Sequence, residues 1–376
     1  MVKNMKTKIL FTHNTAMWYR LPFFRKLSEI YDLDLVFTHI NVIHDVYDKN
    51  VENRIEGLEG VNYTVLKNSG GFARGLVSKV LHRYDLTVGG SWDTPQELLE
   101  SMLLFVITKI KREPMVIWRE DWDWQRDNSI KERILTRVIK FLCNHSDAIL
   151  VPGSLHREYF NKILEVPIDK IHIMPNVSNI EGNADLSKKE HSTKEILYVG
   201  RLIERKGVKY LLDAYNNLDV ADCELIIVGS GPEEENLKEY VNENMIKNVT
   251  FTGKVNNEKL EEYYNSSNLV VIPSINKGMG DPWVFVLNEA MYYYNPVIAT
   301  NAVGAAPDMI KDNGYIVDEK DSVALTDAMN KILNDESLQK KMSLKSKEII
   351  DNEFQYVNMI NSFNDLIKKI ENKEYN

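Results

Sequence analysis

Short apolar runs alternate with longer amphipathic runs along almost the whole chain, and this alternation constrains the fold most strongly. Residues 8–13, 33–39 and 85–90 have the pattern of strands. Residues 21–31 have the pattern of a helix, with Pro22 in its first turn. Successive parallel strands need a long crossover connection, which is usually a helix. The alternation therefore predicts an α/β fold in which helices cover both faces of a parallel sheet.

The polar segment 177–195 interrupts this alternation, which restarts with a strand-like run at 195–200. A chain of 376 residues is too long for one ordinary core, so we interpret the segment as a linker between two doubly wound, Rossmann-like domains. Such sheets bind ligands at the carboxyl ends of their strands, which places the expected site in a central cleft. The predicted parts are a first domain at 1–178, a linker at 179–194, a second domain at 195–350 and a C-terminal helix at 351–376 that packs back towards the first domain.

The composition limits the location and the partners of the protein. A net charge of −9 argues against a dedicated nucleic-acid binder, which would normally be basic. Cys143 and Cys223 lie far apart without partners at metal-ligand spacing, which is typical of thiols in a reducing compartment. No apolar run approaches the roughly 20 residues that span a bilayer. We expect a cytoplasmic protein that is at most peripheral on the inner face of a membrane.

Basic residues follow the first strand of the second half. That strand ends near Gly200, and Arg201, Arg205 and Lys206 come next, at the start of a helix. Basic side chains beside helix N–H groups form an anion site that suits a diphosphate. The alternative is a solvated basic loop. The next Gly turn, at 228–232, does not continue as a dinucleotide-binding fingerprint, and the alternative is a turn that only shapes the cleft.

Two acids eight residues apart flank an apolar stretch in "GMGDPWVFVLNEAM" at 278–291. Carboxylates accept hydrogen bonds from the paired hydroxyls of a hexose or a ribose, so Asp281 and Glu289 could hold the two ends of one nucleotide sugar. For Asp281 the alternative is an acid that stabilises a helix N-terminus. Glu289 lies inside an apolar run, which fits a surface position less well. Further on, Gly304 follows a strand and lets the backbone approach closely.

Together these motifs resemble the retaining glycosyltransferases of family 4, which have the GT-B fold of two Rossmann-like domains facing a central cleft. The resemblance covers the C-terminal half in order, whereas the N-terminal half shares only the strand–helix rhythm and a segment at 151–176. The matching stretches are "VGRL…RKG" at 199–207, "VGSGP" at 228–232, "FTGKV" at 251–255, the two acids at 281 and 289, and "NPVIAT…VG" at 295–304.

The resemblance implies a donor site in the second domain. Arg201 and Lys206 match the pair that holds the donor diphosphate, Asp281 the acid that contacts the sugar, and Glu289 the acid that contacts the ribose. Two positions depart from the family pattern. Val284 stands where a Gly is common, and Asp281 stands where the first acid is usually Glu. The choice of sugar therefore stays open. The remaining implied donor-binding residues are Val255 near the base, the backbone at Trp283, Val284 and Phe285, and Gly304.

The implied reaction is a hexosyltransferase-type transfer with retention, by front-face attack of an acceptor hydroxyl. Arg201 and Lys206 can stabilise the departing diphosphate electrostatically, so neither a metal nor a cofactor is expected. The donor is expected to be a UDP- or GDP-linked sugar, and the acceptor a glycan or a lipid-linked sugar of a cell-surface polysaccharide or glycoconjugate. Two alternatives keep the same fold: a nucleotide-sugar epimerase, and a sugar-nucleotide-binding subunit without activity.

Acceptor-side candidates come from two loops of the first domain. The loop at 118–127 contains Glu120 and Asp121, where many family members have a His, and we count Glu120 among the catalytic candidates. The loop at 13–22 contributes His13 and Arg20, although a lone His at a strand end is more often structural. Aromatic side chains that could stack on sugar rings, or belong to the core, are Trp118, Trp122 and Trp124.

An apolar helix at 96–110 ends in the basic residues Lys109, Lys111 and Arg112. Such an element can dock on an anionic membrane. A buried helix of the first domain with a solvated end is the other interpretation, and the sequence leaves both open.

Overall fold

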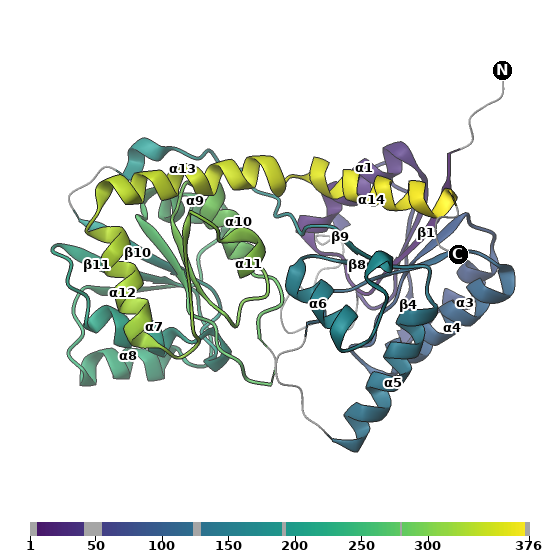
Figure 1. Cartoon of the computed structure of the whole chain (residues 1–376), viewed down its shortest axis with the longest axis horizontal. Helices are drawn as coiled ribbons and strands as arrows, with labels where there is room; N and C mark the ends of the chain where they lie inside the picture. The colour runs from purple at the N-terminus through teal and green to yellow at the C-terminus, as the bar shows by residue number, and fades with distance from the viewer. Residues whose placement is uncertain (1–5, 41–54, 123–128, 190–192, 279, 373–376) are drawn as a thin grey trace.

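The computed structural model describes residues 6–40, 55–122, 129–189, 193–278 and 280–372, which form two large sheets side by side (Figure 1). The first sheet has seven strands in the order β3-β2-β1-β6-β7-β8-β9, and the second has six in the order β12-β11-β10-β13-β14-β15. Every strand pairing in both sheets is parallel. The prediction of an α/β fold is therefore confirmed. None of the described helices is long and apolar enough to cross a membrane.

The first sheet lies between two apolar cores. Phe11 and Leu10 are neighbours on β1 (Lys8–His13), and they enter different cores because successive side chains point to opposite faces. Helix α1 (Leu21–Ile30) covers the Phe11 face. The other strands are β2 (Asp32–Phe37), β3 (Tyr63–Val65), β6 (Leu86–Gly89), β7 (Met115–Trp118), β8 (Ala148–Val151) and β9 (Ile171–Ile173), and the helices on the Leu10 face are α3 (Leu76–Leu81), α4 (Pro95–Lys111), α5 (Ile130–His145) and α6 (Ser154–Lys162).

The second sheet repeats this plan. Leu197 and Tyr198 are neighbours on β10 (Lys194–Val199), and each is buried in a different core. Its other strands are β11 (Cys223–Val228), β12 (Val249–Gly253), β13 (Leu269–Ile272), β14 (Val297–Thr300) and β15 (Gly314–Val317), and its helices are α7 (Val208–Asn216), α8 (Glu234–Glu243), α9 (Asn257–Ser266), α10 (Phe285–Tyr292), α11 (Ala306–Met309), α12 (Ser322–Leu333) and α13 (Glu336–Glu353).

A small hairpin lies where the sequence pattern defined no element. Strands β4 (Lys67–Ser69) and β5 (Phe72–Arg74) pair antiparallel across a two-residue loop. The loop residues Gly70 and Gly71 have φ values of 60° and 83°, the positive values that a tight hairpin turn requires at both positions. The hairpin leads directly into α3.

The last helix, α14 (Tyr356–Glu371), returns to the first sheet after α13 has run along the second (Figure 1). Its Phe363 is fully buried in the same core as Phe11 and Phe23, with ring centroids 6.2 and 6.1 Å away. The hydroxyl of Tyr31 on the α1 side donates to Asn364 Oδ1 at 2.7 Å. Helix α14 is therefore part of the first core and ties the two halves together.

Candidate functional site

A cavity of about 760 Å³ opens at the carboxyl ends of β1, β6 and β7, which are neighbours in the first sheet. His13 ends β1, Gly90 follows β6 and Trp118 ends β7, and all three line the cavity. Gly278 and Pro282 of the second half complete the wall. The cavity thus lies where parallel sheets bind ligands and where the two halves of the chain meet.

The predicted acceptor-side residues Arg20 and Glu120 meet in this cavity. The Arg20 guanidinium forms an ion pair with Glu120 and lies over the Trp118 ring, 4.2 Å from its centroid. Asn176 donates a second hydrogen bond to the same Glu120 oxygen, at 2.9 Å. Burial by itself disfavours the charge on Arg20, but Glu120 and Tyr19 together outweigh it and raise the pKa of the guanidinium. Arg20 is therefore a fixed cation that orients Glu120.

Asp121 points to a different partner, Arg119, which the sequence prediction did not include. Arg119 Nε lies 2.6 Å from Asp121 Oδ2, and its Nη2 lies 2.7 Å from Asp93 Oδ1. The Trp92 ring lies under the guanidinium at 4.6 Å and donates its indole N–H to Asp121 at 3.0 Å. These contacts fix Asp121 as part of the cavity wall.

His13 lines the cavity as a neutral imidazole. Burial, and then the nearby Arg20, hold the pKa of His13 well below its ordinary value. Its Nδ1 accepts from the backbone N–H of Thr15 at 3.2 Å, which leaves the proton on Nε2. The ring packs edge-on against Phe24 and Trp118. Trp118 and Trp122 are buried and line the cavity, while Trp124 lies outside the described residues.

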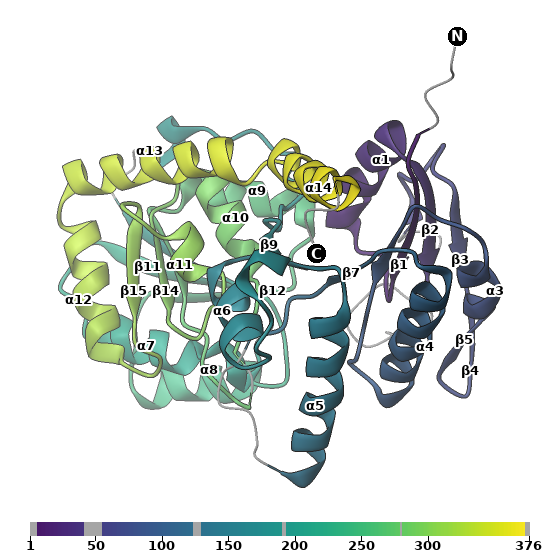
Figure 2. The ribbon, with the colours of Figure 1, turned by 45° about the vertical axis from the view of Figure 1, so that its right-hand side comes forward.

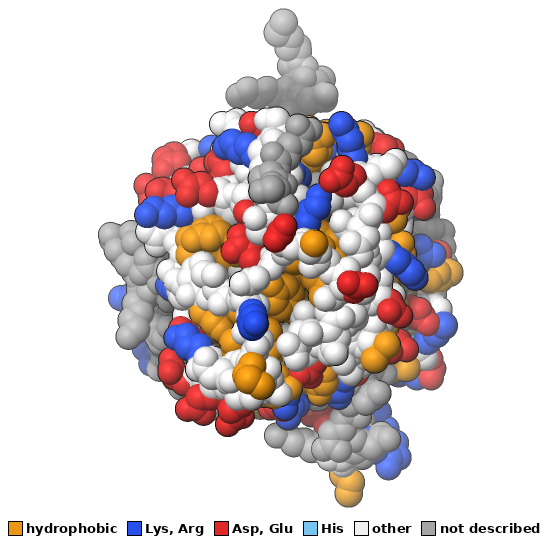
Figure 3. Space-filling view, turned by 90° about the vertical axis from the view of Figure 1, so that its left-hand side faces the viewer, with side chains coloured by type: hydrophobic (Ala, Val, Ile, Leu, Met, Phe, Trp, Pro, Cys, Tyr) orange, Lys and Arg blue, Asp and Glu red, His pale blue; other side chains and the backbone are white. Residues whose placement is uncertain are grey.

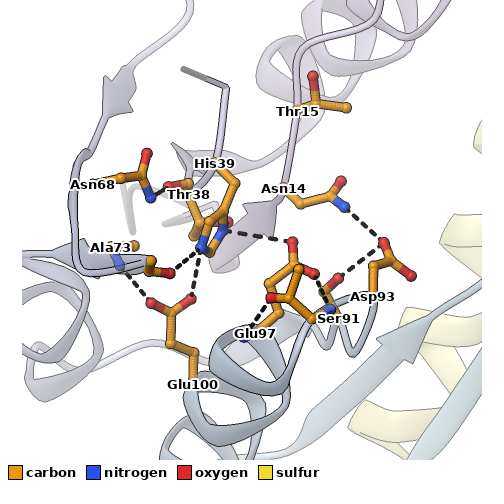
Figure 4. A network of polar contacts seen from close by, with 12 residues as sticks. Asn14, Thr15, Thr38, His39, Asn68, Ala73, Ser91, Asp93, Glu97 and Glu100 are labelled. Carbon is orange, nitrogen blue, oxygen red and sulfur yellow. Dashed lines mark hydrogen bonds and ion pairs between the residues drawn. The ribbon is translucent and has the colours of Figure 1, made fainter. Parts of the chain in front are cut away.

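Helix α4 supplies another polar wall of the cavity (Figure 4). The ring of His39 lies between two buried carboxylates, 3.6 Å from Glu97 and 3.7 Å from Glu100. Glu97 also closes a capping box with Thr94, and Glu100 accepts from the backbone N–H of Ala73. Burial raises the pKa of Glu100, although the Ala73 N–H and His39 oppose this. The sequence prediction contained none of this cluster.

In the second half, Asp281 is buried with three partners. Ser274 Oγ donates to it at 2.6 Å, Lys206 lies at 2.7 Å and Arg205 at 2.8 Å. Burial alone would raise the pKa of Asp281, but Lys206 and Arg205 outweigh it and lower the pKa. Arg201, the predicted partner of Lys206, has an exposed side chain. The structure thus brings Lys206 and Asp281 together and adds Arg205 to them.

Glu289 has the opposite environment, because no Lys or Arg of the described residues forms an ion pair with it. The hydroxyl of Tyr264 donates to its Oε2 at 2.7 Å and that of Ser178 to its Oε1 at 3.4 Å. Burial raises the pKa of Glu289 to about 7, and the two hydroxyl hydrogen bonds oppose the rise. Ser178 belongs to the segment that joins the two halves, so this carboxylate sits at the junction between them.

The loop between the two acids is anchored by its side chains. Trp283 is buried and donates to Asn288 at 3.1 Å, while Val284 is the N-cap residue of α10. The Phe285 ring lies 4.0 Å from that of Tyr19, across the gap between the halves. Since the first N–H groups of a helix have no partner within it, the backbone here offers donors.

Gly304 and Val255 complete the predicted set. The Gly304 N–H donates to Asp281 O at 2.8 Å, and a Cβ at Gly304 would lie 2.4 Å from Pro282 O. Only a glycine at position 304 therefore allows the backbone to lie this close to Pro282. Val255 is half-buried and packs against the core cluster that contains Trp283.

Comparisons with known proteins give one family and several relatives. The family model described as glycosyl transferases group 1 matches residues 181–349. Alpha-D-kanosaminyltransferase of Streptomyces kanamyceticus is 24% identical over 58% of this chain and 60% of its own. The amylovoran biosynthesis glycosyltransferase AmsD of Erwinia amylovora is 28% identical over 55% of this chain and 58% of its own. The match thus spans about three-fifths of the length of these relatives.

Solved structures resemble the whole chain at low sequence identity. Anabaena Alr3699/HepE, crystallised with UDP, has a TM-score of 0.72 at 18% identity and covers 96% of this chain and 99% of its own. Sucrose-phosphate synthase from Thermosynechococcus elongatus has a TM-score of 0.71 at 17% identity and covers 97% of this chain and 99% of its own. The two-sheet arrangement is therefore the GT-B fold, as the sequence predicted.

The raised pKa of Glu289 predicts a pH dependence of stability. The folded carboxyl keeps its proton up to about pH 7, against an ordinary pKa of 4.5, so between these values the native state binds more protons than the unfolded state. Stability then falls as the pH rises through this window. Across this window we expect the free energy of unfolding to fall by roughly 3 kcal/mol more in the wild type than in Glu289→Gln.

Urea unfolding at several pH values checks this prediction. Glu243 on α8 is an exposed acid, so Glu243→Gln is a matched control that should follow the wild type. If the wild type and Glu289→Gln show the same pH dependence, the raised pKa is wrong.

Proposed function

We propose that this chain, whose residues 181–349 form a domain of the group 1 glycosyltransferase family, transfers a sugar from a nucleotide-diphosphate sugar to a hydroxyl of a glycan or lipid-linked acceptor. The observation that carries the proposal is that this domain places Asp281 and Lys206 beside a cavity lined from both halves of a GT-B fold. Polysaccharide biosynthesis is the process named for the relative AmsD. We assign this chain to the same kind of process.

The donor is assigned to the second half. Lys206 and Arg201 would bind the diphosphate, near the turn that opens α7, and Glu289 would accept hydrogen bonds from the ribose hydroxyls. Tyr264 and Ser178 hold the Glu289 carboxylate in place for that contact. We expect UDP or GDP as the nucleotide. UDP is the first to test because HepE has been crystallised with UDP and with UDP-glucose.

The proposed reaction retains the configuration at the anomeric carbon. The bond from that carbon to the diphosphate oxygen breaks, the acceptor oxygen attacks from the same face, and its proton passes to the leaving phosphate. Lys206 and Arg201 stabilise the negative charge that develops on the diphosphate, a role that preorganised cations can perform without a divalent ion. We therefore propose a metal-independent reaction without a cofactor.

The acceptor is assigned to the cavity of the first half. Trp118 and Trp122 line this cavity and are the aromatic candidates for contact with a sugar ring, and Asp121 and His13 form polar wall positions. Glu120 is held by Arg20 and Asn176, so its carboxylate can accept the hydrogen bond of an acceptor hydroxyl in one orientation. We propose that Glu120 positions this hydroxyl for attack.

A second candidate function is a nucleotide-sugar-binding subunit without activity. The observation that favours it is the set of three partners on Asp281, which engages the acid assigned to the donor sugar. A donor sugar must share or displace one of these contacts. Transfer activity in the purified protein would exclude this candidate.

The two acids should separate nucleotide binding from transfer. Removing one partner of a buried hydrogen bond costs about 1–3 kcal/mol, so Glu289→Ala should weaken binding of the nucleoside diphosphate roughly 5- to 150-fold. Asp281→Ala should leave that affinity within a few-fold and reduce transfer. Isothermal titration calorimetry measures the affinities, with Glu243→Ala as the exposed-acid control. Equal nucleotide affinity in Glu289→Ala and the wild type would contradict the ribose assignment.

Glu120 should affect transfer without affecting the donor. Glu120→Gln keeps the shape but loses the charge; a hydrogen bond to a charged group contributes about 1.5–3 kcal/mol, so we expect kcat to fall roughly 10- to 100-fold while donor affinity is unchanged. Steady-state kinetics with a saturating donor checks this, and donor hydrolysis in the absence of acceptor serves as the internal control. An unchanged kcat would show that Glu120 only supports the cavity wall.

A further inference from the structure

The lining of the cavity in the first half carries an excess of negative charge. Two guanidinium groups, those of Arg20 and Arg119, line it together with six carboxylates, which is an excess of four acids over bases. His13, which also lines the cavity, is held neutral by burial and by the nearby Arg20. At the far end of the second half, by contrast, acidic and basic side chains are interspersed (Figure 3). The six carboxylates are those of Asp93, Glu97, Glu100, Glu120, Asp121 and Glu132.

Both guanidinium groups of the lining already have carboxylate partners. Arg20 forms its ion pair with Glu120. Arg119 lies 2.7 Å from Asp93 and 2.6 Å from Asp121. The two bases therefore compensate three of the six acids, and the charge of the other three has to be compensated in another way.

The other three acids come from two neighbouring helices, with Glu97 and Glu100 on α4 and Glu132 on α5. Figure 2 shows these helices side by side, and the rings of Phe105 and Phe141 join them edge-to-face with centroids 5.9 Å apart. Among the described residues, no Lys or Arg forms an ion pair with any of these three acids. We call Glu97, Glu100 and Glu132 the acidic wall of the cavity.

His39 does not compensate the acidic wall fully. Its ring lies between the carboxylates of Glu97 and Glu100 (Figure 4), and each of these also accepts one backbone N–H, from Thr94 and from Ala73. Even with a proton on both ring nitrogens, His39 supplies one positive charge to two carboxylates. Burial raises the pKa of Glu100, as expected for a carboxylate without a full counter-charge. A cation bound in the cavity would supply the missing charge.

Two neutral polar groups of the lining also lack partners. Thr15 and Trp118 are each 7% exposed, and both line the cavity. Thr15 Oγ1 and Trp118 Nε1 have no hydrogen-bond partner among the described residues. Buried polar groups are rarely left without a partner, so these two atoms indicate a ligand that brings polar groups of its own. The hydroxyls of a sugar can accept from the indole N–H and exchange a hydrogen bond with the threonine hydroxyl.

We propose that the cavity binds a glycan that carries a protonated amine, an amino sugar whose ammonium group lies against the acidic wall. The ammonium group donates up to three hydrogen bonds to these carboxylates, and the sugar hydroxyls meet Thr15 and Trp118. The same negative charge repels phosphates and carboxylates, so a uronic acid or the phosphate of a lipid carrier stays outside the cavity. That this glycan is the acceptor rests on the proposed function; that it binds here does not.

Calorimetric titration of the full chain with three oligosaccharides of equal length tests the proposal. The probes are an oligomer of glucosamine, its N-acetylated form and an oligomer of galacturonic acid, at a pH where the amines are protonated. The first two differ in charge but share the same sugar ring and linkage. The glucosamine oligomer should bind roughly tenfold more tightly than its N-acetylated form, the range of a hydrogen bond to a charged group. The anionic oligomer should bind most weakly.

Two variants locate the binding to the acidic wall. Glu97→Gln keeps an oxygen that can accept the Thr94 N–H, and Glu132→Gln changes a half-buried acid. Each should weaken binding of the glucosamine oligomer roughly tenfold and leave the N-acetylated oligomer unchanged, because only the charge is lost. A merely structural role would weaken both oligomers equally. Glu243→Gln, an exposed acid on α8, is the control that should bind as the wild type does.

The proposal is overturned if the glucosamine oligomer binds no more tightly than the other two probes, or if its affinity is unchanged in both wall variants. A parallel titration with UDP separates this result from the proposed sugar transfer. Binding of UDP without a preference for the amine leaves the transfer proposal standing and removes this inference. A preference for the amine without binding of any nucleoside diphosphate supports an amino-sugar site and counts against the transfer.

Discussion

Parallel strand pairing in both sheets is the constraint on which the rest of this molecule depends. Because each pairing is parallel, every strand must be followed by a crossover, and the loops that leave the carboxyl ends gather at one edge of each sheet. His13, Gly90 and Trp118 come from three such ends, and the second sheet contributes Gly278 and Pro282 to the same cavity. Side chains from distant parts of the sequence therefore meet without any special local motif. Helix α14 returns to the first core and ties the second half to the first.

The two acids of the predicted donor site, Asp281 and Glu289, have different neighbours, and their pKa values shift in opposite directions. Asp281 has Lys206 and Arg205 within ion-pair distance, and these cations keep it ionised although it is buried. The donors that face Glu289 among the described residues are two hydroxyl groups, and burial raises the pKa of Glu289 to about 7. Two carboxyl groups on one loop and helix thus differ in charge near neutral pH. Environment, and not residue type, sets this difference.

Much of the fold could be predicted from the sequence because the spacing of apolar residues distinguishes strands from helices along most of the chain. The strand predicted at 8–13 agrees with β1, and the helix predicted at 21–31 agrees with α1 to within one residue. The β4–β5 hairpin was missed because its strands have three residues each, too few to show a period. Its Gly-Gly turn was the available signal.

The sequence predicted which positions belong to the site, but it did not predict how their side chains pair. Motif spacing placed Lys206 and Asp281 in one site, but the participation of Arg205 depends on a 3₁₀ turn at Glu204–Lys206 that directs both neighbouring bases towards the acid. The His39 cluster joins residues far apart in the sequence, so no local pattern reveals it. The capping box of Thr94 and Glu97 is a recognisable sequence pattern. The contact between Glu97 and His39 could not be predicted from that pattern.

The most direct test of the account is thermal unfolding of the purified protein with UDP, GDP, ADP and dTDP, each with EDTA and with magnesium. A diphosphate at a hundred times its dissociation constant adds about 2.7 kcal/mol to stability, which gives a measurable rise in Tm. The account predicts such a rise with one nucleoside diphosphate, preserved in EDTA. The absence of a rise with every nucleotide would contradict a donor site at Lys206 and Glu289, and a rise only with magnesium would contradict metal-independent binding.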